Sequence, residues 1–198
     1  NPKPRTKKAI DMTQPTASHA STTTQPPIYL EDLTVGDQFT SGEHAMDEAQ
    51  ITAFAAQFDP QPFHLDDAAA RDTLFGGLAA SGWHTAAVTM RLQVTSGLPI
   101  AGGIIGAGGE LTWPRPTRPT DVLHVVSEVV QIQPSKSKPD RGMVTVRSET
   151  RNQHGDVLQL TTVRIVVPRR RYSSMPSSRA RLSALPWSPS ATTSILVP

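Results

Sequence analysis

The sequence contains no cysteine, which excludes disulfide bonds and thiolate metal sites. It has no run of about 18 apolar residues, the length that a membrane-spanning helix needs. The N-terminal stretch carries basic residues without the apolar segment of a secretory signal. We therefore expect a cytoplasmic protein with no membrane partner. The His, Asp and Glu residues show no metal-ligand spacing, so no metal site is predicted, and the Gly-x-Ser-x-Gly motif of serine hydrolases is absent.

Apolar and aromatic residues are scarce, at 37% and 5% of the 198 residues, and the scarcity is greatest at the two ends. Residues 1–27 are rich in Thr, Ser, Pro and Lys, and residues 169–198 lack any regular apolar period. Segments with so little to bury cannot offset the entropy lost on ordering, so both are predicted to be disordered tails. Residues 28–168 are long enough to form one domain with a substantial core.

The excess of positive charge also belongs to the two tails. They hold nine of the 19 Lys and Arg residues and one of the 17 Asp and Glu residues. The segment 28–168 therefore keeps ten basic and sixteen acidic side chains, a formal charge of −6. An acidic domain without a basic patch or a recognisable binding motif is not expected to bind nucleic acid.

Periodicity predicts helices in the first half of this segment and strands in the second. Helical spacing favours helices over residues 47–58, 66–74 and 81–96. Val, Thr and Ile then dominate four predicted strands, over residues 110–113, 121–132, 143–151 and 157–167, the last two joined by a turn at 152–156. The order indicates an α+β fold, with one long helix against a curved antiparallel sheet.

The helix predicted over 81–96 is apolar on more than one side. One stripe is formed by Trp83, Ala86, Ala87, Met90 and Val94, and a second by Val88 and Leu92. Such a helix is usually buried on both sides. We therefore expect the long helix to be enclosed, and, because the sheet is small, to be covered partly by a second copy of the chain.

Glycines between residues 97 and 109 follow this helix. They lack the strand–turn–helix setting of a dinucleotide-binding fingerprint, so a mobile or close-packed loop is predicted.

The strongest functional signal is a carboxylate and an imidazole on one short, stiff segment. Asp59 and His64 flank Pro60 and Pro62, which restrict the backbone around them. A glycine, Gly82, opens the long predicted helix after a candidate N-cap, Ser81. A free N–H in the first turn of a helix suits an oxyanion. A base, an acid and an oxyanion donor are the groups needed to add water to a double bond conjugated with a carbonyl.

These residues resemble the MaoC-type acyl dehydratases, the (R)-specific enoyl-CoA hydratases of the hotdog fold. The resemblance covers about residues 30–168. It rests on the Asp-x-x-x-x-His segment, the glycine-rich entry to the helix at Gly82, and the later stretch from Leu111 to Pro116 that leads to Thr120-Asp121. It implies hydration of a trans-2-enoyl-CoA to an (R)-3-hydroxyacyl-CoA, or the reverse. The substrate would be an acyl thioester of coenzyme A or a carrier protein, as in fatty acid metabolism. No separate cofactor is implied, and a homodimer or a dimer of dimers is expected.

Carried residue by residue, the resemblance makes Asp59 and His64 the catalytic pair and the Gly82 N–H the donor to the thioester oxygen. Gln61 stands where relatives commonly have Asn and is expected to support the segment or the water. Ser81 replaces a His found in relatives, and Met90 occupies a position where some hydratases have Ser. These departures leave two alternatives open, a hotdog acyl-CoA thioesterase and a non-catalytic acyl-CoA-binding protein.

Overall fold

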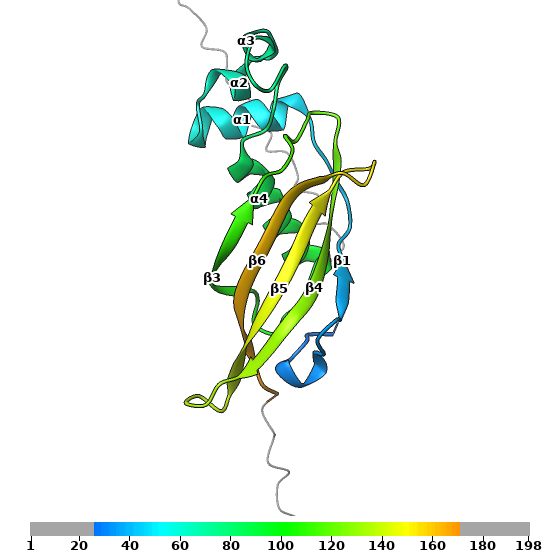
Figure 1. Ribbon diagram of the computed structural model, residues 1–198, viewed down its shortest axis with the longest axis vertical. Helices are drawn as coiled ribbons and strands as arrows, with labels where there is room; N and C mark the ends of the chain where they lie inside the picture. Colours follow the sequence, from blue (N-terminus) through cyan, green and yellow to red (C-terminus); the bar gives the residue numbers. More distant parts are fainter. Residues whose placement is uncertain (1–25, 171–198) are drawn as a thin grey trace, which may run out of the picture.

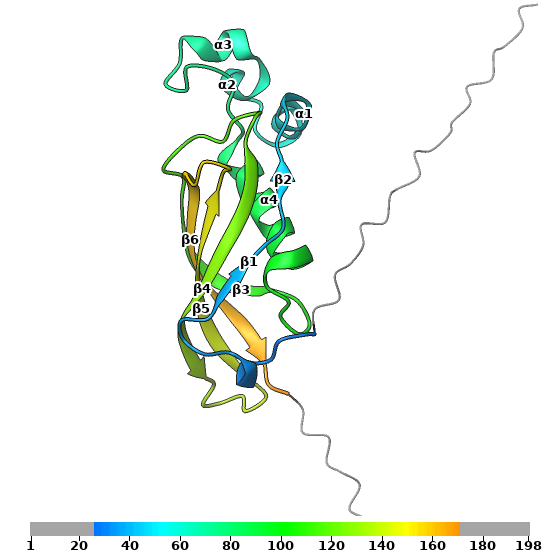
Figure 2. The ribbon, with the colours of Figure 1, turned by 90° about the vertical axis from the view of Figure 1, so that its right-hand side faces the viewer.

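The computed structural model describes residues 26–170. The predicted tails at residues 1–27 and 169–198 lie outside the described residues except for residues 26–27 and 169–170. The chain forms one antiparallel sheet with a helix along one of its faces (Figures 1 and 2). The sheet order is β1-β4-β5-β6-β3, with β2 pairing β4 beyond β1. The strands are β1 (Gln38–Thr40), β2 (His44–Ala45), β3 (Ile105–Thr112), β4 (Val122–Pro134), β5 (Arg141–Arg151) and β6 (Val157–Pro168).

The helices divide into a central one and a group at one end of the sheet. The helical segments are η1 (Leu30–Asp32), α1 (Glu48–Phe58), α2 (Pro62–Leu65), α3 (Asp67–Arg71) and α4 (Gly82–Leu92), and α4 continues into a π-helical turn, η2 (Gln93–Gly97). The central helix is α4, and α1, α2 and α3 gather beyond one end of the sheet (Figure 1). The predicted α+β hotdog fold, a curved antiparallel sheet around a long helix, is confirmed.

The sheet forms where its strands were predicted because β-branched residues alternate along them. In β5 every second residue is buried against the core. The predicted turn between β5 and β6 is present, with Gly155 at a φ of 82°, a value that favours glycine. All four predicted strands therefore exist, and each observed strand includes most of the residues expected.

The core between helix and sheet is partly polar. Two apolar clusters lie toward its ends, one around Leu98, Val144 and Ile165 and one around Ile51, Val88 and Leu123. Between them, one face of α4 and η2 is polar. Thr89 and Gln93 bond Thr150 and Ser148 of the sheet, and Thr85 bonds Thr117 in the connection between β3 and β4. Each buried polar group has a partner, so the seam costs little despite its burial.

Within the single chain, α4 is buried on one side only. Val88 and Leu92 are buried, as expected. The other stripe faces outward, where Trp83, Met90 and Val94 are 62%, 47% and 55% exposed. The sheet covers one face of the helix, and no other element within residues 26–170 covers this stripe (Figure 2). Periodicity gave the helix but not which of its faces meets the sheet.

Two further expectations need correction. The glycines at 106, 108 and 109 belong to strand β3, where the register shifts between Gly106 and Gly109, and not to a loop. A side chain at Gly109 would come within 2.4 Å of the Thr162 carbonyl, so close backbone approach explains that glycine. His64 lies on the one-turn helix α2 and not in a loop, because Pro62 suits the first position of a helix. Within the described residues, every helix is too short or too polar to cross a bilayer.

Candidate active site

A sharp bend between α1 and α2 brings Asp59 and His64 together. Helix α1 ends at Asp59, since Pro60 cannot continue it, and Gln61 caps the next helix in an extended conformation. The bend is closed by hydrogen bonds from the Gln61 N–H to the Asp59 carbonyl, at 2.7 Å, and from the His64 N–H to the Gln61 carbonyl, at 2.9 Å. The bend lies at the end of the sheet where α4 begins (Figure 1).

The surroundings of His64 fix its tautomer. The ring is buried and packs edge-on against Phe63. Its Nδ1 lies 2.7 Å from the Ala79 carbonyl, which can only accept a hydrogen bond. Nδ1 therefore carries a proton, and in the neutral imidazole Nε2 presents a lone pair. That lone pair faces Asp59.

The Asp59 carboxylate is held by two hydrogen bonds. The Ser81 hydroxyl donates to Oδ2 at 2.7 Å, and the Gln61 amide donates to Oδ1 at 2.7 Å. The bond from Ser81 is the main cause that keeps the pKa of Asp59 below its usual value, and the bond from Gln61 acts in the same direction against partial burial. Asp59 is therefore ionised at neutral pH.

Asp59 and His64 together form a pair of acceptors. His64 Nε2 lies 3.5 Å from Asp59 Oδ2. When the imidazole is neutral, Nε2 carries a lone pair, and neither group donates a hydrogen bond to the other. A water molecule that donates one hydrogen to each would be oriented and made more nucleophilic.

The start of α4 adds a hydrogen-bond donor. Ser81 caps the helix by accepting from the Trp83 N–H at 3.2 Å while its own hydroxyl proton points to Asp59. The Gly82 N–H, one position earlier, has no acceptor within residues 26–170. Such an N–H at the positive end of a helix suits a developing oxyanion.

Trp113 is part of the site, although its sequence pattern gave it no role. Its indole lies against Gly82, where an added Cβ would sit 2.6 Å from Trp113 Cε2. Gly82 is therefore required for close packing as well as for its N–H. In the sequence, the only hint of this contact is that a glycine opens the helix and a Trp occurs later in the chain. The two are 31 positions apart, so only the fold shows that they touch.

A cavity of about 470 Å³ joins these groups. Asp59, His64, Ser81, Gly82 and Trp113 all line it. The three groups predicted to share one site therefore do so. Gln61 reaches Asp59 from the exposed side, and Met90 lines a different cavity. Residues 26–170 contain no group of three or more His, Asp or Glu side chains arranged to hold a metal ion.

His84, on α4, packs against α1. Its ring stacks on Phe54, with ring centres 4.6 Å apart and planes within 5° of parallel. It is buried, and its Nδ1 has no hydrogen-bond partner among the described residues.

Comparisons with known proteins agree with this site. A family model described as a MaoC like domain matches residues 12–152. The MaoC-like dehydratase from Rhodospirillum rubrum is 65% identical, with a TM-score of 0.72 over 72% of this chain and 98% of that one. The (R)-hydratase PhaJ1 from Pseudomonas aeruginosa is 29% identical, with a TM-score of 0.59 over 73% of this chain and 88% of that one. The uncharacterised protein YdeM of Bacillus subtilis is 34% identical over 127 residues, 63% of this chain and 87% of its own length.

Proposed function

Because the chain belongs to the MaoC-like dehydratase family, a family of hydro-lyases, we propose that it adds water reversibly to a trans-2-enoyl-CoA and forms an (R)-3-hydroxyacyl-CoA. The similar (R)-hydratase PhaJ1 supports the direction and the stereochemical class. The observation that carries the proposal is the 3.5 Å approach of His64 Nε2 to the Asp59 carboxylate beside a free helix N–H.

In the proposed reaction the pair positions one water molecule. As the water oxygen bonds to C3 of the enoyl group, the pair accepts one proton from it. The electrons of the C2=C3 bond move toward the thioester, and the negative charge on its oxygen is stabilised by the Gly82 N–H. The pair then returns one proton to C2, so that the product has gained one water.

Ser81 and Gln61 support the pair in this scheme. Their hydrogen bonds occupy both carboxylate oxygens of Asp59 and keep it charged. The Ala79 carbonyl holds the His64 ring in place by accepting the hydrogen bond from Nδ1. We assign these three residues to positioning and not to chemistry.

We also propose that the protein acts as a homodimer. Trp83, Met90 and Val94 form an uncovered apolar stripe on α4, and β3 is an edge strand with Ile105 58% exposed. Large uncovered apolar patches and unpaired edges mark interaction surfaces. A second copy of the chain would cover both. Light scattering that finds a monomer at micromolar concentration would contradict this assignment.

Hydration of crotonyl-CoA, followed by the loss of enoyl absorbance, tests the function. Asp59→Asn keeps the shape of the side chain but removes its charge. His64→Asn keeps an N–H near the Ala79 carbonyl but removes Nε2. A positioned acid–base pair contributes about 10²–10⁴-fold, so we expect each variant to lose about 10²-fold or more in kcat with its folding largely retained. Wild-type turnover in both would refute the proposal.

The same samples separate the alternatives. Release of free thiol from saturated acyl-CoA, without loss of enoyl absorbance, would indicate a thioesterase. Tight binding of acyl-CoA without any turnover would indicate a binding protein.

A further inference from the structure

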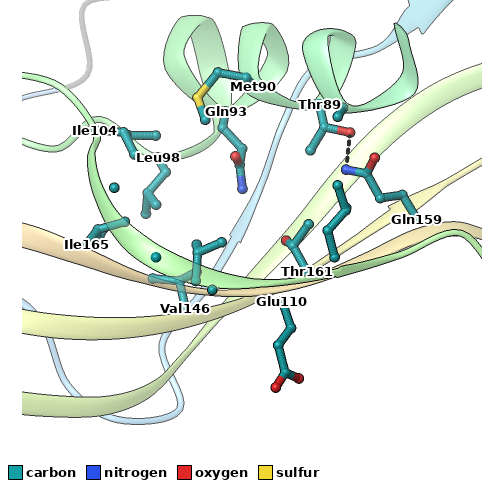
Figure 3. Close-up of a pocket in the computed structure, with 16 residues that line it drawn as sticks. Thr89, Met90, Gln93, Leu98, Ile104, Glu110, Val146, Gln159, Thr161 and Ile165 are labelled. Carbon is teal, nitrogen blue, oxygen red and sulfur yellow. Dashed lines mark hydrogen bonds between the residues drawn. The ribbon is translucent and has the colours of Figure 1, made fainter. Parts of the chain in front are cut away.

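A second cavity lies beneath α4 (Figure 3). It has a volume of about 310 Å³, and its lining is mainly apolar, with Ala86, Met90, Leu98, Ile104, Val146 and Ile165 among its walls. The two cavities have no lining residue in common. The side chains between the two cavities therefore separate an apolar space of this volume from the proposed site of the reaction.

On each of three elements, α4, the end of β3 and β6, the boundary between the two cavities falls between neighbouring residues or at a single residue. On α4, Thr85 lines the catalytic cavity and Thr89, one turn later, lines the second. On the segment that ends β3, Trp113 lines the catalytic cavity and Leu111 lines the second. On β6, Gln159 lines the second cavity and binds Trp113 across the boundary.

A chain of hydrogen bonds holds this boundary in place. The Trp113 indole N–H donates to Gln159 Oε1 at 2.9 Å, and Gln159 Nε2 donates to Thr89 Oγ1 at 3.0 Å (Figure 3). Thr89 in turn bonds Thr150 at 2.7 Å. Gln159 is 1% exposed and uses both ends of its amide, so it cannot rotate without leaving buried polar atoms unpaired.

The indole is confined on its other sides as well. Its ring rests against Gly82, and Trp83 packs against it edge-on with ring centres 5.4 Å apart. The buried hydrogen bond and these two contacts restrict the motion of the indole, while Trp113 as a whole is 40% exposed.

We propose that Trp113, locked by Gln159, is a partition that limits the acyl group to a short chain, and that its removal joins the catalytic cavity to the apolar one. This rests on the proposed function, because the chain in question is the acyl part of the thioester. A longer chain would have to displace the indole and break the Trp113–Gln159 bond before it reached apolar surface. The class of substrate is thus a short-chain enoyl thioester.

The test compares but-2-enoyl-CoA with oct-2-enoyl-CoA in the wild type, in Trp113→Ala and in Gln159→Leu. Each methylene newly buried contributes about 0.8 kcal/mol, about a four-fold gain. Two or more newly buried methylenes therefore predict about a ten-fold or larger rise in the ratio of kcat/KM for the long substrate to that for the short one in Trp113→Ala. Gln159→Leu frees the indole and should raise the ratio less.

Val35→Ala is the control. It removes an exposed apolar side chain that lines neither cavity, so we expect the ratio to stay at the wild-type value. Trp113→Phe, which loses the N–H and part of the ring, replaces Trp113→Ala if the latter fails to fold. A wild type that hydrates both substrates equally well, or folded Trp113 variants with an unchanged ratio, would overturn the partition.

Calorimetry with butyryl-CoA and octanoyl-CoA separates this inference from the proposed function. If no variant hydrates any substrate but Trp113→Ala gains affinity for octanoyl-CoA over butyryl-CoA, the proposed reaction fails and the partition stands. If hydration occurs and neither ratio moves, the reaction stands and the partition fails. If neither thioester binds any variant, both are rejected.

Discussion

The Ser81 hydroxyl lies 2.7 Å from the carboxylate of Asp59, 22 positions earlier in the chain. The same oxygen accepts the Trp83 N–H and so caps α4. One side chain therefore fixes both the start of the helix that carries Gly82 and the carboxylate opposite it. The relative placement of the acceptor pair and the free N–H depends on Ser81.

Ser81→Ala should shift the pH dependence of the reaction. The bond from Ser81 is the main cause of the lowered pKa of Asp59. Without the Ser81 hydroxyl the pKa of Asp59 rises, so the carboxylate is protonated at a higher pH. The acid limb of kcat/KM therefore moves toward higher pH. Loss of the cap also lowers the free energy of unfolding by about 0.5–2 kcal/mol. A pH–rate profile and urea unfolding measure the two effects.

Asp47→Ala is the control for the loss of a cap alone. Asp47 caps α1 by accepting the Gln50 N–H at 2.7 Å. It does not line the catalytic cavity. We expect it to lower stability by a similar amount and to leave the acid limb in place. Identical acid limbs in Ser81→Ala and Asp47→Ala would show that Ser81 does not act through Asp59.

Gly82→Ala should be destabilising for a reason outside the helix. Alanine favours a helix over glycine by about 1 kcal/mol. Here, however, the new Cβ would lie 2.6 Å from the Trp113 ring and would have to push it aside. Overpacking of this kind costs about 1–3 kcal/mol. We therefore expect a net loss in the free energy of unfolding, together with a raised KM because the indole moves within the cavity.

A double-mutant cycle isolates that contact. In the Trp113→Ala background the obstacle is absent, so Gly82→Ala should become neutral or stabilising. Equal effects of Gly82→Ala on the free energy of unfolding in both backgrounds, measured by urea unfolding, would mean that displacing the indole does not destabilise the protein.

The proximity of Asp59 and His64 could be predicted because the two residues are close in sequence. Asp59 and His64 are five positions apart, and the two prolines between them restrict the chain enough for spacing to indicate proximity. The partners that tune the pair could not all be found this way. Ala79 contributes a backbone carbonyl, which any residue could supply, and the Trp113–Gln159 bond joins residues 46 positions apart.

The orientation of α4 could not be predicted for a physical reason. Apolar periodicity shows that a face must be covered but not what covers it. Thr85, Thr89 and Gln93 are polar, yet all three are buried. Thr89 and Gln93 find hydrogen-bond partners on the sheet, and Thr85 finds one in the connection between β3 and β4. The stripe through Trp83, Met90 and Val94 is apolar and remains uncovered in the single chain.

His84 should make the stability of the protein sensitive to mild acid. Burial is the main cause that lowers the pKa of its imidazole from 6.5, with a smaller effect from nearby His44 and an opposing one from Asp47. The unfolded chain therefore binds a proton at a higher pH than the folded protein does. Stability that is present above pH 6.5 is lost as the pH falls through that value, and the loss ends below the folded pKa.

His84→Phe keeps a ring against Phe54 and removes the titrating group. Urea unfolding between about pH 8 and pH 5 should give a smaller decline in the free energy of unfolding for this variant than for the wild type. His154→Gln, at an exposed position in the turn between β5 and β6, should decline as the wild type does. If the His84→Phe and wild-type curves run parallel across this range, the buried imidazole contributes nothing to the acid sensitivity, and other titratable groups account for all of it.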